Sequence, residues 1–349
     1  MNFRSYNITL YPVLYLIAGI YKVAIAVRNI LYDKGHVKTH RLRVPVISVG
    51  NIEAGGTGKT PMVISLAQLL IRKGYRVGVL TRGYKRESRG EVIVCSGNGP
   101  CVNSRMSGDE PYVIAKSVPG AIIISDKNKT AAGKTAIDKY NCNVLIIDDG
   151  FQHRKLERDI DIVLWDGTRD PLEARIIPSG RMRESWAGLK RASIVIITRS
   201  GEKNSELASF LLERNPNLEI FYSQTKVVGL IYYSTQKDLK LSEIENKRIL
   251  ALCGIGNPKQ FFSTIEYLSP KNLTTKTFPD HFKYRAKDLE IISEDANKTA
   301  ADFIITTEKD AANLPPEAAR MKDLLVLKIA ANINENTKAA ILSKLPPSK

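Results

Sequence analysis

Residues 44–61 read VPVISVGNIEAGGTGKTP, and this stretch indicates the fold of the chain more clearly than any other. The apolar, β-branched run at 44–49 predicts a buried strand, and a glycine-rich turn follows it. Beyond the turn, Val63, Leu66 and Leu70 recur at helical spacing. A strand, a glycine loop, the Lys59-Thr60 pair and a helix in this order predict a phosphate-binding P-loop.

The loop has a defined chemistry toward a nucleotide. Its inward-turned N–H groups and the helix dipole would bind phosphate, Lys59 would reach the β- and γ-phosphates, and Thr60 would ligate Mg²⁺. We expect ATP to contact the whole loop, which comprises Glu53, Ala54, Gly55, Gly56, Thr57, Gly58, Lys59 and Thr60. Glu53 replaces the glycine of the strict motif, and an acidic side chain is unfavourable there unless it points outward. The alternative is a glycine turn before an ordinary helix.

Composition limits the class of protein. The 349 residues, 43% hydrophobic and 25% charged, suit a soluble chain of two domains or one large α/β unit. The net charge of +16 favours an anionic partner such as a nucleotide, an acidic lipid or a nucleic acid. No zinc-finger spacing or basic-aromatic motif supports nucleic acid, so no nucleic-acid partner is predicted. Four cysteines without C-x-x-C spacing fit a reducing compartment.

The amino-terminal segment is strongly apolar. From Tyr11 to Val27 only Lys22 interrupts the apolar and tyrosine residues, and Arg28 follows. A spanning helix needs about 20 mostly apolar residues, so the cations favour a helix at the membrane interface instead. The alternatives are a signal sequence, because Ala24-Ile25-Ala26 weakly resembles a cleavage site, and a helix docked on the protein's own core.

Acidic residues end a second apolar strand. Residues 143–149 read NVLIIDD, and a strand-end aspartate holds Mg²⁺ in P-loop sites. Asp148 and Asp149 are therefore predicted metal ligands, with the choice between them open. Glu184 ends a loop at 178–184 that is rich in possible hydrogen-bond donors to phosphate, and Arg181 of this loop is predicted to bind the substrate. Glu184 could join the metal shell or form a salt bridge to Arg181 or Arg183.

Other polar residues lie where open α/β sheets bind ligands. Arg82 and Tyr84 follow a predicted strand at 76–81, so they would hold phosphate or sugar, or form a solvated basic turn. Asp109 stands before a predicted helix, where it could be an N-cap or a general base. His281 could orient or share a proton with a carboxylate, or be an ordinary surface histidine.

The predicted organisation has four parts: an amino-terminal membrane-interface helix region at 1–35, a P-loop domain at 36–225, a β-hairpin linker at 226–246 and a second α/β domain at 247–349. The strand–glycine–helix pattern that begins at Arg248 supports the last part, although its lone G-x-G is weak evidence for a second nucleotide site.

Several motifs, in order, resemble the tetraacyldisaccharide 4'-kinase family of the lipid A pathway. They are SVGN at 48–51, GGTGKTP at 55–61, RGY at 82–84, GDEP at 108–111, DDGFQH at 148–153, GRMRE at 180–184, DH at 280–281 and TEKD at 307–310. The resemblance covers roughly residues 10 to 330. It implies a P-loop NTPase-like α/β/α sandwich with a second, smaller α/β/α domain joined by a two-stranded β link.

The resemblance also implies an activity. It is ATP-dependent phosphorylation of the 4'-hydroxyl of a tetraacylated glucosamine disaccharide 1-phosphate, with Mg²⁺, at the cytoplasmic face of the bacterial inner membrane. The protein would be peripheral or monotopic there, without an obligatory protein partner. Asp109 becomes the base, paired with His281, and Asp148, Asp149 and Glu184 become the candidate Mg²⁺ shell.

A rival from another class is a membrane-associated P-loop ATPase that recruits a partner. The GGTGKT core at 55–60 is shared with partition-type ATPases, but Ala54 replaces their signature lysine. A GTPase is less favoured, because no convincing N-K-x-D motif is present.

Overall fold

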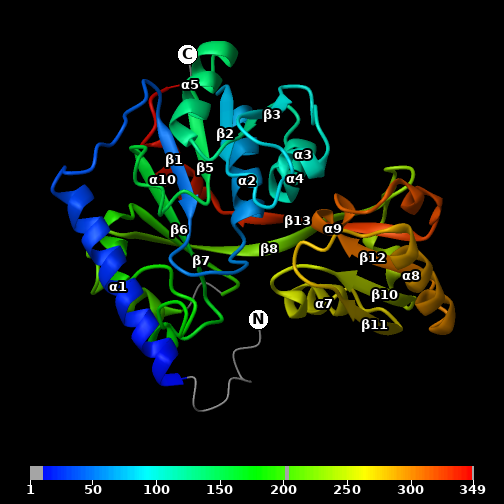
Figure 1. Cartoon of the computed structure of the whole chain (residues 1–349). Helices are drawn as coiled ribbons and strands as arrows, with labels where there is room; N and C mark the ends of the chain where they lie inside the picture. Colours follow the sequence, from blue (N-terminus) through cyan, green and yellow to red (C-terminus); the bar gives the residue numbers. More distant parts are fainter. Residues whose placement is uncertain (1–10, 201–203, 348–349) are drawn as a thin grey trace. The chain divides into compact units, whose positions relative to one another are not determined.

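The computed structural model describes residues 11–200 and 204–347. Residues 1–10 of the predicted 1–35 region, 201–203 of the predicted kinase domain and 348–349 of the last predicted domain lie outside this part. The chain forms two compact units (Figure 1). Unit 1 comprises Met1–Thr81, Asn128–Gln224 and Asn332–Lys349, and unit 2 comprises Arg82–Lys127 and Thr225–Ala331.

Unit 1 is built on a parallel sheet in the order β8-β7-β6-β1-β5-β2. Its strands are β1 (Val46–Gly50), β2 (Val77–Thr81), β5 (Val144–Asp148), β6 (Ile160–Asp166), β7 (Ile194–Thr198) and the first part of β8 (Glu219–Tyr232). All but β8 are buried along their whole length, as expected for apolar strands covered on both faces. The apolar run at 44–49 therefore forms a central strand of this sheet.

Helices surround the sheet of unit 1. They are α1 (Tyr11–Asp33), α2 (Lys59–Arg72), α5 (Lys129–Tyr140), α6 (Ser205–Leu212) and α10 (Glu335–Leu342). Helix α2 packs on β1, β2 and β5, and it buries the predicted periodic residues Val63, Leu66 and Leu70. This packing fixes the start of α2 at the carboxyl end of β1, where the glycine loop lies.

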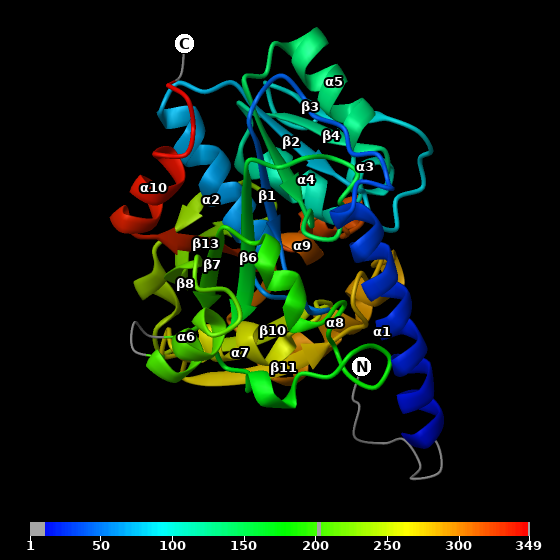
Figure 2. The same cartoon turned by 90° about the vertical axis from the view of Figure 1, so that its left-hand side faces the viewer.

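Helix α1 is the exception, because it runs along the outer edge of the ribbon (Figure 2) and much of its apolar surface is exposed. Leu16, Ile20 and Val23 are 67%, 64% and 62% exposed. By length and composition the segment Pro12–Asp33 could cross a membrane. Polar contacts attach the helix to the rest of unit 1, including a 3.1 Å hydrogen bond from the Tyr21 hydroxyl to the Arg183 carbonyl.

Unit 2 contains a second parallel sheet in the order β11-β10-β12-β13. Its strands are β10 (Arg248–Cys253), β11 (Asn272–Thr277), β12 (Phe303–Thr307) and β13 (Leu324–Ile333), with helices α7 (Pro258–Glu266), α8 (Ala286–Lys298) and α9 (Glu308–Ala311). An aromatic cluster of Phe278, Phe282 and Tyr284, with ring centroids 4.8–5.0 Å apart, packs against this sheet.

The same unit holds an earlier segment of the chain. It consists of the antiparallel pair β3 (Val92–Ser96) and β4 (Ile122–Ser125), with the short helices α3 (Ser104–Ser107) and α4 (Asp109–Ser117) between them. The last part of β8 pairs antiparallel with β9 (Asp238–Leu239), which places a hairpin within the predicted linker. The predicted domain boundaries stay a prediction.

The chain alternates between the units, because it passes from one to the other at 81/82, 127/128, 224/225 and 331/332. At the last two points it does so within a strand, since β8 and β13 each continue from one unit into the other.

Candidate active site

The glycine loop of unit 1 is held in shape by its own side chains. Gly58 has a φ of 88°, a left-handed conformation that suits glycine, and it directly precedes α2. The Asn51 amide donates a 2.9 Å hydrogen bond to the Thr57 hydroxyl, and the Thr198 hydroxyl donates to the Thr57 carbonyl at 3.2 Å. The loop thus presents Lys59 and Thr60 at the first turn of a helix, which is the geometry of a phosphate site.

Asp149 contacts the loop lysine directly. Its carboxylate lies 3.5 Å from the Lys59 ammonium and accepts bonds of 2.8 and 2.9 Å from the Arg183 guanidinium. Burial alone would raise the pKa of Asp149, but the charges of Lys59 and Arg183 lower it to about 2. Asp149 is therefore an anion that holds two cations beside the loop.

Asp148, the last residue of β5, lies opposite Val49 in the register of the β1–β5 pair. It is buried, and it therefore stands at the level where β1 gives way to the loop. A loop hydroxyl from Thr60 and a strand-end carboxylate are the hard oxygen donors that Mg²⁺ takes alongside nucleotide phosphates and water. The donor set of Thr60 and Asp148 fits that ion.

Glu184 is engaged in other bonds. Its carboxylate accepts from the Arg191 guanidinium at 2.7 Å, from the Gln152 amide at 2.9 Å and from the Asn29 amide at 3.3 Å. In the part of the chain that the structure describes, no three His, Cys, Asp or Glu residues gather closely enough to hold a metal. The assignment of Asp149 and Glu184 as ligands stays a prediction.

Glu53 does not point outward to solvent. It is 3% exposed, and its carboxylate pairs with the Arg169 guanidinium at 2.5 Å. Arg169 also contacts Asp166, which in turn pairs with Arg199 at 2.5 Å. Burial raises the pKa of Glu53, and Arg169 opposes this shift. The acid that replaces a glycine is thus accommodated by a buried ion-pair network.

Two arginines tie this network to the glycines of the loop. Arg199 donates a 2.5 Å bond to the Gly56 carbonyl. The Arg181 guanidinium lies against Gly55, where an added Cβ would be only 2.7 Å from Nη2. Arg181, which the sequence predicts as a hydrogen-bond donor to phosphate, therefore lies beside the glycine loop. Its role in binding the substrate stays a prediction.

The second group of predicted residues lies in unit 2. Asp109 begins α4, and its carboxylate is 2.9 Å from Nδ1 of His281. Asn313 also donates to Asp109. Burial would raise the pKa of Asp109, but these hydrogen bonds and the nearby Lys309 charge lower it below its ordinary value. The structure thus brings together two residues that are far apart in sequence, with the carboxyl group held as an anion.

Lys309 completes this arrangement from the other side of the imidazole. Its ammonium is 3.3 Å from Nε2 of His281, and it pairs with Glu110 and Asp280 at 3.1 Å each. An ammonium only donates hydrogen bonds, so Nε2 must be the accepting nitrogen. The proton of neutral His281 is then on Nδ1, from which it is donated to Asp109.

The loop at residues 82–84 flanks the same histidine. The rings of Tyr84 and His281 have centroids 5.2 Å apart, and Arg82 is exposed. Gly108 lies so close to Gly83 that a Cβ atom added to Gly108 would be only 3.0 Å from the Cα of Gly83. This close approach holds the Tyr84 loop against the start of α4, while the substrate contacts of Arg82 and Tyr84 stay a prediction.

Sequence reasoning assigned no role to Lys309, Asn313 or Arg169. It offered Arg183 as a possible salt-bridge partner of Glu184, but Arg183 pairs with Asp149, and Glu184 pairs with Arg191. The TEKD motif at 307–310 contains Lys309, and the GRMRE motif at 180–184 contains Arg183. These motifs could have directed attention to both residues. Nothing local points to Asn313 or Arg169, because their contacts join distant segments.

Comparison with known proteins identifies the family of this chain. The model of the tetraacyldisaccharide-1-P 4'-kinase (LpxK) family matches residues 10–346. The chain belongs to this family. A tetraacyldisaccharide 4'-kinase of Halothermothrix orenii is 38% identical over 86% of this chain and 82% of its own length. One of Syntrophus aciditrophicus is 40% identical over 85% and 82%.

A solved structure agrees with these relatives. The apo form of LpxK from Aquifex aeolicus in complex with ATP is 30% identical, with a TM-score of 0.75 over 97% of this chain and 99% of that one. The predicted family, the P-loop NTPase-like α/β fold and the class of enzyme, a kinase of lipid A biosynthesis, are confirmed. The predicted 4'-kinase activity is that of the family.

Proposed function

We propose that this chain transfers the γ-phosphoryl group of ATP to the 4'-hydroxyl of a tetraacylated glucosamine disaccharide 1-phosphate, with the residues of unit 1 holding ATP and Asp109 acting as the base. Family membership supports the reaction, and the described contacts support the roles of the residues. Catalysis of this kind depends on positioning and on neutralising phosphate charge.

The glycine loop would cradle the phosphates, from Glu53 through Thr60. Lys59 would neutralise charge on the β- and γ-phosphates, as its place after the loop requires. Asp149, whose carboxylate is itself held by the Arg183 guanidinium, keeps that ammonium in place at 3.5 Å. Binding of ATP would then draw Lys59 from the carboxylate toward the phosphates, since both are anions that compete for it.

Thr60 and Asp148 would hold Mg²⁺ in this site, and the ion would supply charge neutralisation at the β- and γ-oxygens. Lys129 supports Asp148 from behind, because its ammonium donates to the Asp148 carbonyl. That bond orients the end of β5 independently of any ligand.

Asp109 would accept the proton of the attacking hydroxyl. Its lowered pKa keeps it ionised at neutral pH, as a proton acceptor must be. His281 donates its Nδ1 proton to one carboxylate oxygen and thereby orients the group, while the other oxygen can face the substrate. Lys309 is the positioning residue that fixes this tautomer of His281.

Helix α1 would bring the enzyme to its lipid substrate. Its exposed apolar residues and the cations Lys22 and Arg28 suit the boundary between headgroups and acyl chains of an anionic leaflet. Because ATP is cytosolic, the surface would be the cytoplasmic face of the bacterial inner membrane, with the protein peripheral or monotopic.

The observation that carries the proposal is the 2.9 Å contact between Asp109 and His281, since a recruiting ATPase would not need such a pair. The test is transfer of label from [γ-³²P]ATP to the tetraacyl disaccharide 1-phosphate in detergent micelles. We expect transfer by the wild type and a loss of about 10²- to 10⁴-fold in Asp109→Asn. Lys59→Ala should also lose transfer.

Two results would count against the proposal. Transfer that survives in Asp109→Asn would remove Asp109 as the base. No labelled lipid, together with ATP hydrolysis stimulated by a protein partner or by membranes alone, would favour the recruiting ATPase.

A further inference from the structure

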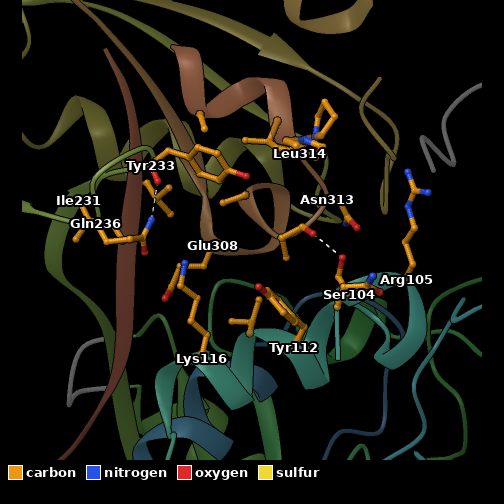
Figure 3. Close-up of a pocket in the computed structure, with 18 of the residues that line it drawn as sticks. Ser104, Arg105, Tyr112, Lys116, Ile231, Tyr233, Gln236, Glu308, Asn313 and Leu314 are labelled. Carbon is orange, nitrogen blue, oxygen red and sulfur yellow. Dashed lines mark hydrogen bonds between the residues drawn. The ribbon is translucent and has the colours of Figure 1, made fainter. Parts of the chain in front are cut away.

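A cavity of about 720 Å³ lies within unit 2, apart from the predicted site residues (Figure 3). Its walls come from α3 and α4 on one side, from the turn after β8 on another, and from α9, the loop after it and β13. The volume lies within the range of about 300–1,000 Å³ that is usual for small-molecule sites. The cavity is therefore large enough to enclose a metabolite.

One end of the cavity is cationic. Lys116 of α4 and Lys328 of β13 both line it, and Arg105 and Lys283 line it elsewhere. Burial and the Lys328 charge lower the pKa of Lys116, while the Glu308 charge opposes this shift. The two ammonium groups that line the cavity therefore repel one another. An anion between them would relieve this repulsion.

The one acid in the lining, Glu308, offsets part of this charge, because its carboxylate interacts with both Lys116 and Lys328. Burial raises the pKa of Glu308, and its carboxyl group already accepts hydrogen bonds from Ser117 and from the backbone N–H of Ile329. Lys283 is paired with Glu87 outside the lining at 2.8 Å. The lining thus keeps an excess of positive charge around Lys116 and Lys328.

The remaining walls are aromatic and apolar. In Figure 3 the side chains of Tyr112 and Tyr233 extend into the cavity from opposite walls. Val113, Ile231 and Leu314 add aliphatic surface. Phenol rings on two sides favour a flat unsaturated group, while the lysines favour a negative one.

We propose that this cavity binds a small aromatic anion, with its phosphate or carboxylate group between Lys116 and Lys328 and its ring between Tyr112 and Tyr233. One wall of the cavity also touches the proposed base, because Asn313 lines the cavity and donates to Asp109. The binding proposal does not depend on the role of Asp109 in catalysis.

The experiment is calorimetric titration of the full-length protein with 1-naphthyl phosphate, under saturating ADP so that the P-loop is filled. Inorganic phosphate and 1-naphthol are titrated in parallel to separate the contributions of charge and ring. We expect 1-naphthyl phosphate to bind at least about tenfold more tightly than either fragment, because inorganic phosphate lacks the ring and 1-naphthol lacks the charged group.

Three variants locate the site. Lys116→Gln/Lys328→Gln should weaken binding by about 10- to 100-fold. The matched control Lys271→Gln/Lys298→Gln removes two exposed lysines of the same unit and should bind as the wild type does. Ala319→Trp adds bulk to the lining without changing its charge, so it should also weaken binding, and it provides an independent test if the lysine variant does not fold.

Each contrary result overturns the proposal. One is binding of 1-naphthyl phosphate no tighter than that of inorganic phosphate. Others are unchanged affinity in the folded lysine variant or in Ala319→Trp, and an equal loss in the matched control. Kinase activity does not enter any of these measurements, so failure here is distinguishable from failure of the proposed function.

Discussion

Replacing Lys309 by methionine tests the proton arrangement around the proposed base. The change removes the ammonium 3.3 Å from Nε2 of His281 and keeps a side chain of similar length. His281 then loses the donor that holds its proton on Nδ1, and Asp109 loses a nearby positive charge that lowers its pKa. Glu110 and Asp280 lose their shared counter-ion at the same time.

The expected size of the effect follows from the bond that is lost. A hydrogen bond to a charged group contributes about 1.5–3 kcal/mol, which corresponds to about a 10- to 100-fold decrease in kcat if the bond is needed to hold the reactive tautomer. Because removing the Lys309 cation raises the pKa of Asp109, the acidic limb of the kcat–pH profile should move to higher pH. KM for ATP should change little.

The assay is the label-transfer reaction measured across pH with saturating ATP and lipid acceptor. Lys309→Arg, which keeps the positive charge, should recover much of the activity. Lys283→Met is the matched control, because Lys283 also lies close to His281 in sequence but pairs with Glu87 at the surface. The reasoning is refuted if Lys309→Met keeps both the wild-type kcat and the wild-type acidic limb, or if the control shifts that limb equally.

Three further predictions concern unit 1. Asp148→Asn should raise the Mg²⁺ concentration needed for half-maximal activity, whereas Asp149→Asn should lower kcat by about tenfold or more with an unchanged Mg²⁺ requirement, since it releases Lys59. Equal effects of both variants on a magnesium titration would contradict this division of roles. Glu53→Gln should lower the free energy of unfolding by about 1–3 kcal/mol in urea titrations, because it leaves the Arg169 guanidinium buried without this carboxylate. Glu173→Gln, at an exposed position, serves as the control. Burial and nearby cations lower the pKa of His153 to about 4, so the neutral form is favoured in the folded state and up to about 3 kcal/mol of stability should be lost as pH falls from about 6.5 to about 4. Urea titrations of His153→Gln should show a weaker loss over that range, and an identical pH dependence would exclude His153 as the cause.

The strands and the glycine loop could be predicted because their signals are local. The run at 44–49 is apolar and β-branched, and the helix after Lys59 repeats its buried residues at helical spacing. Such patterns determine which residues a strand or helix buries, whatever its neighbours are. The family motifs then identified the kinase fold and the class of enzyme.

The separate roles of the adjacent acids Asp148 and Asp149 could not be predicted from local patterns. Asp148 ends β5, but Asp149 has a φ of 50°, which redirects its side chain toward Lys59 and Arg183. Likewise, nothing near Glu53 in sequence reveals that Arg169 is its partner. Contacts of this kind depend on how distant segments pack, so the residues near each acid in the sequence do not reveal them.

The order in which the chain visits the two units has a consequence for biosynthesis. Unit 1 includes a segment that follows residue 331, and the Tyr75 hydroxyl donates a 2.5 Å hydrogen bond to the Pro346 carbonyl within it, so unit 1 can be completed only after residues 225–331 of unit 2 have been made. The segment Arg82–Lys127 of unit 2 must likewise wait for residues 225–331. Neither half can be completed during early translation, and neither can be excised by cutting the chain once. Each unit therefore has to wait, with an unfinished sheet, until the intervening segment of the other unit has been synthesised.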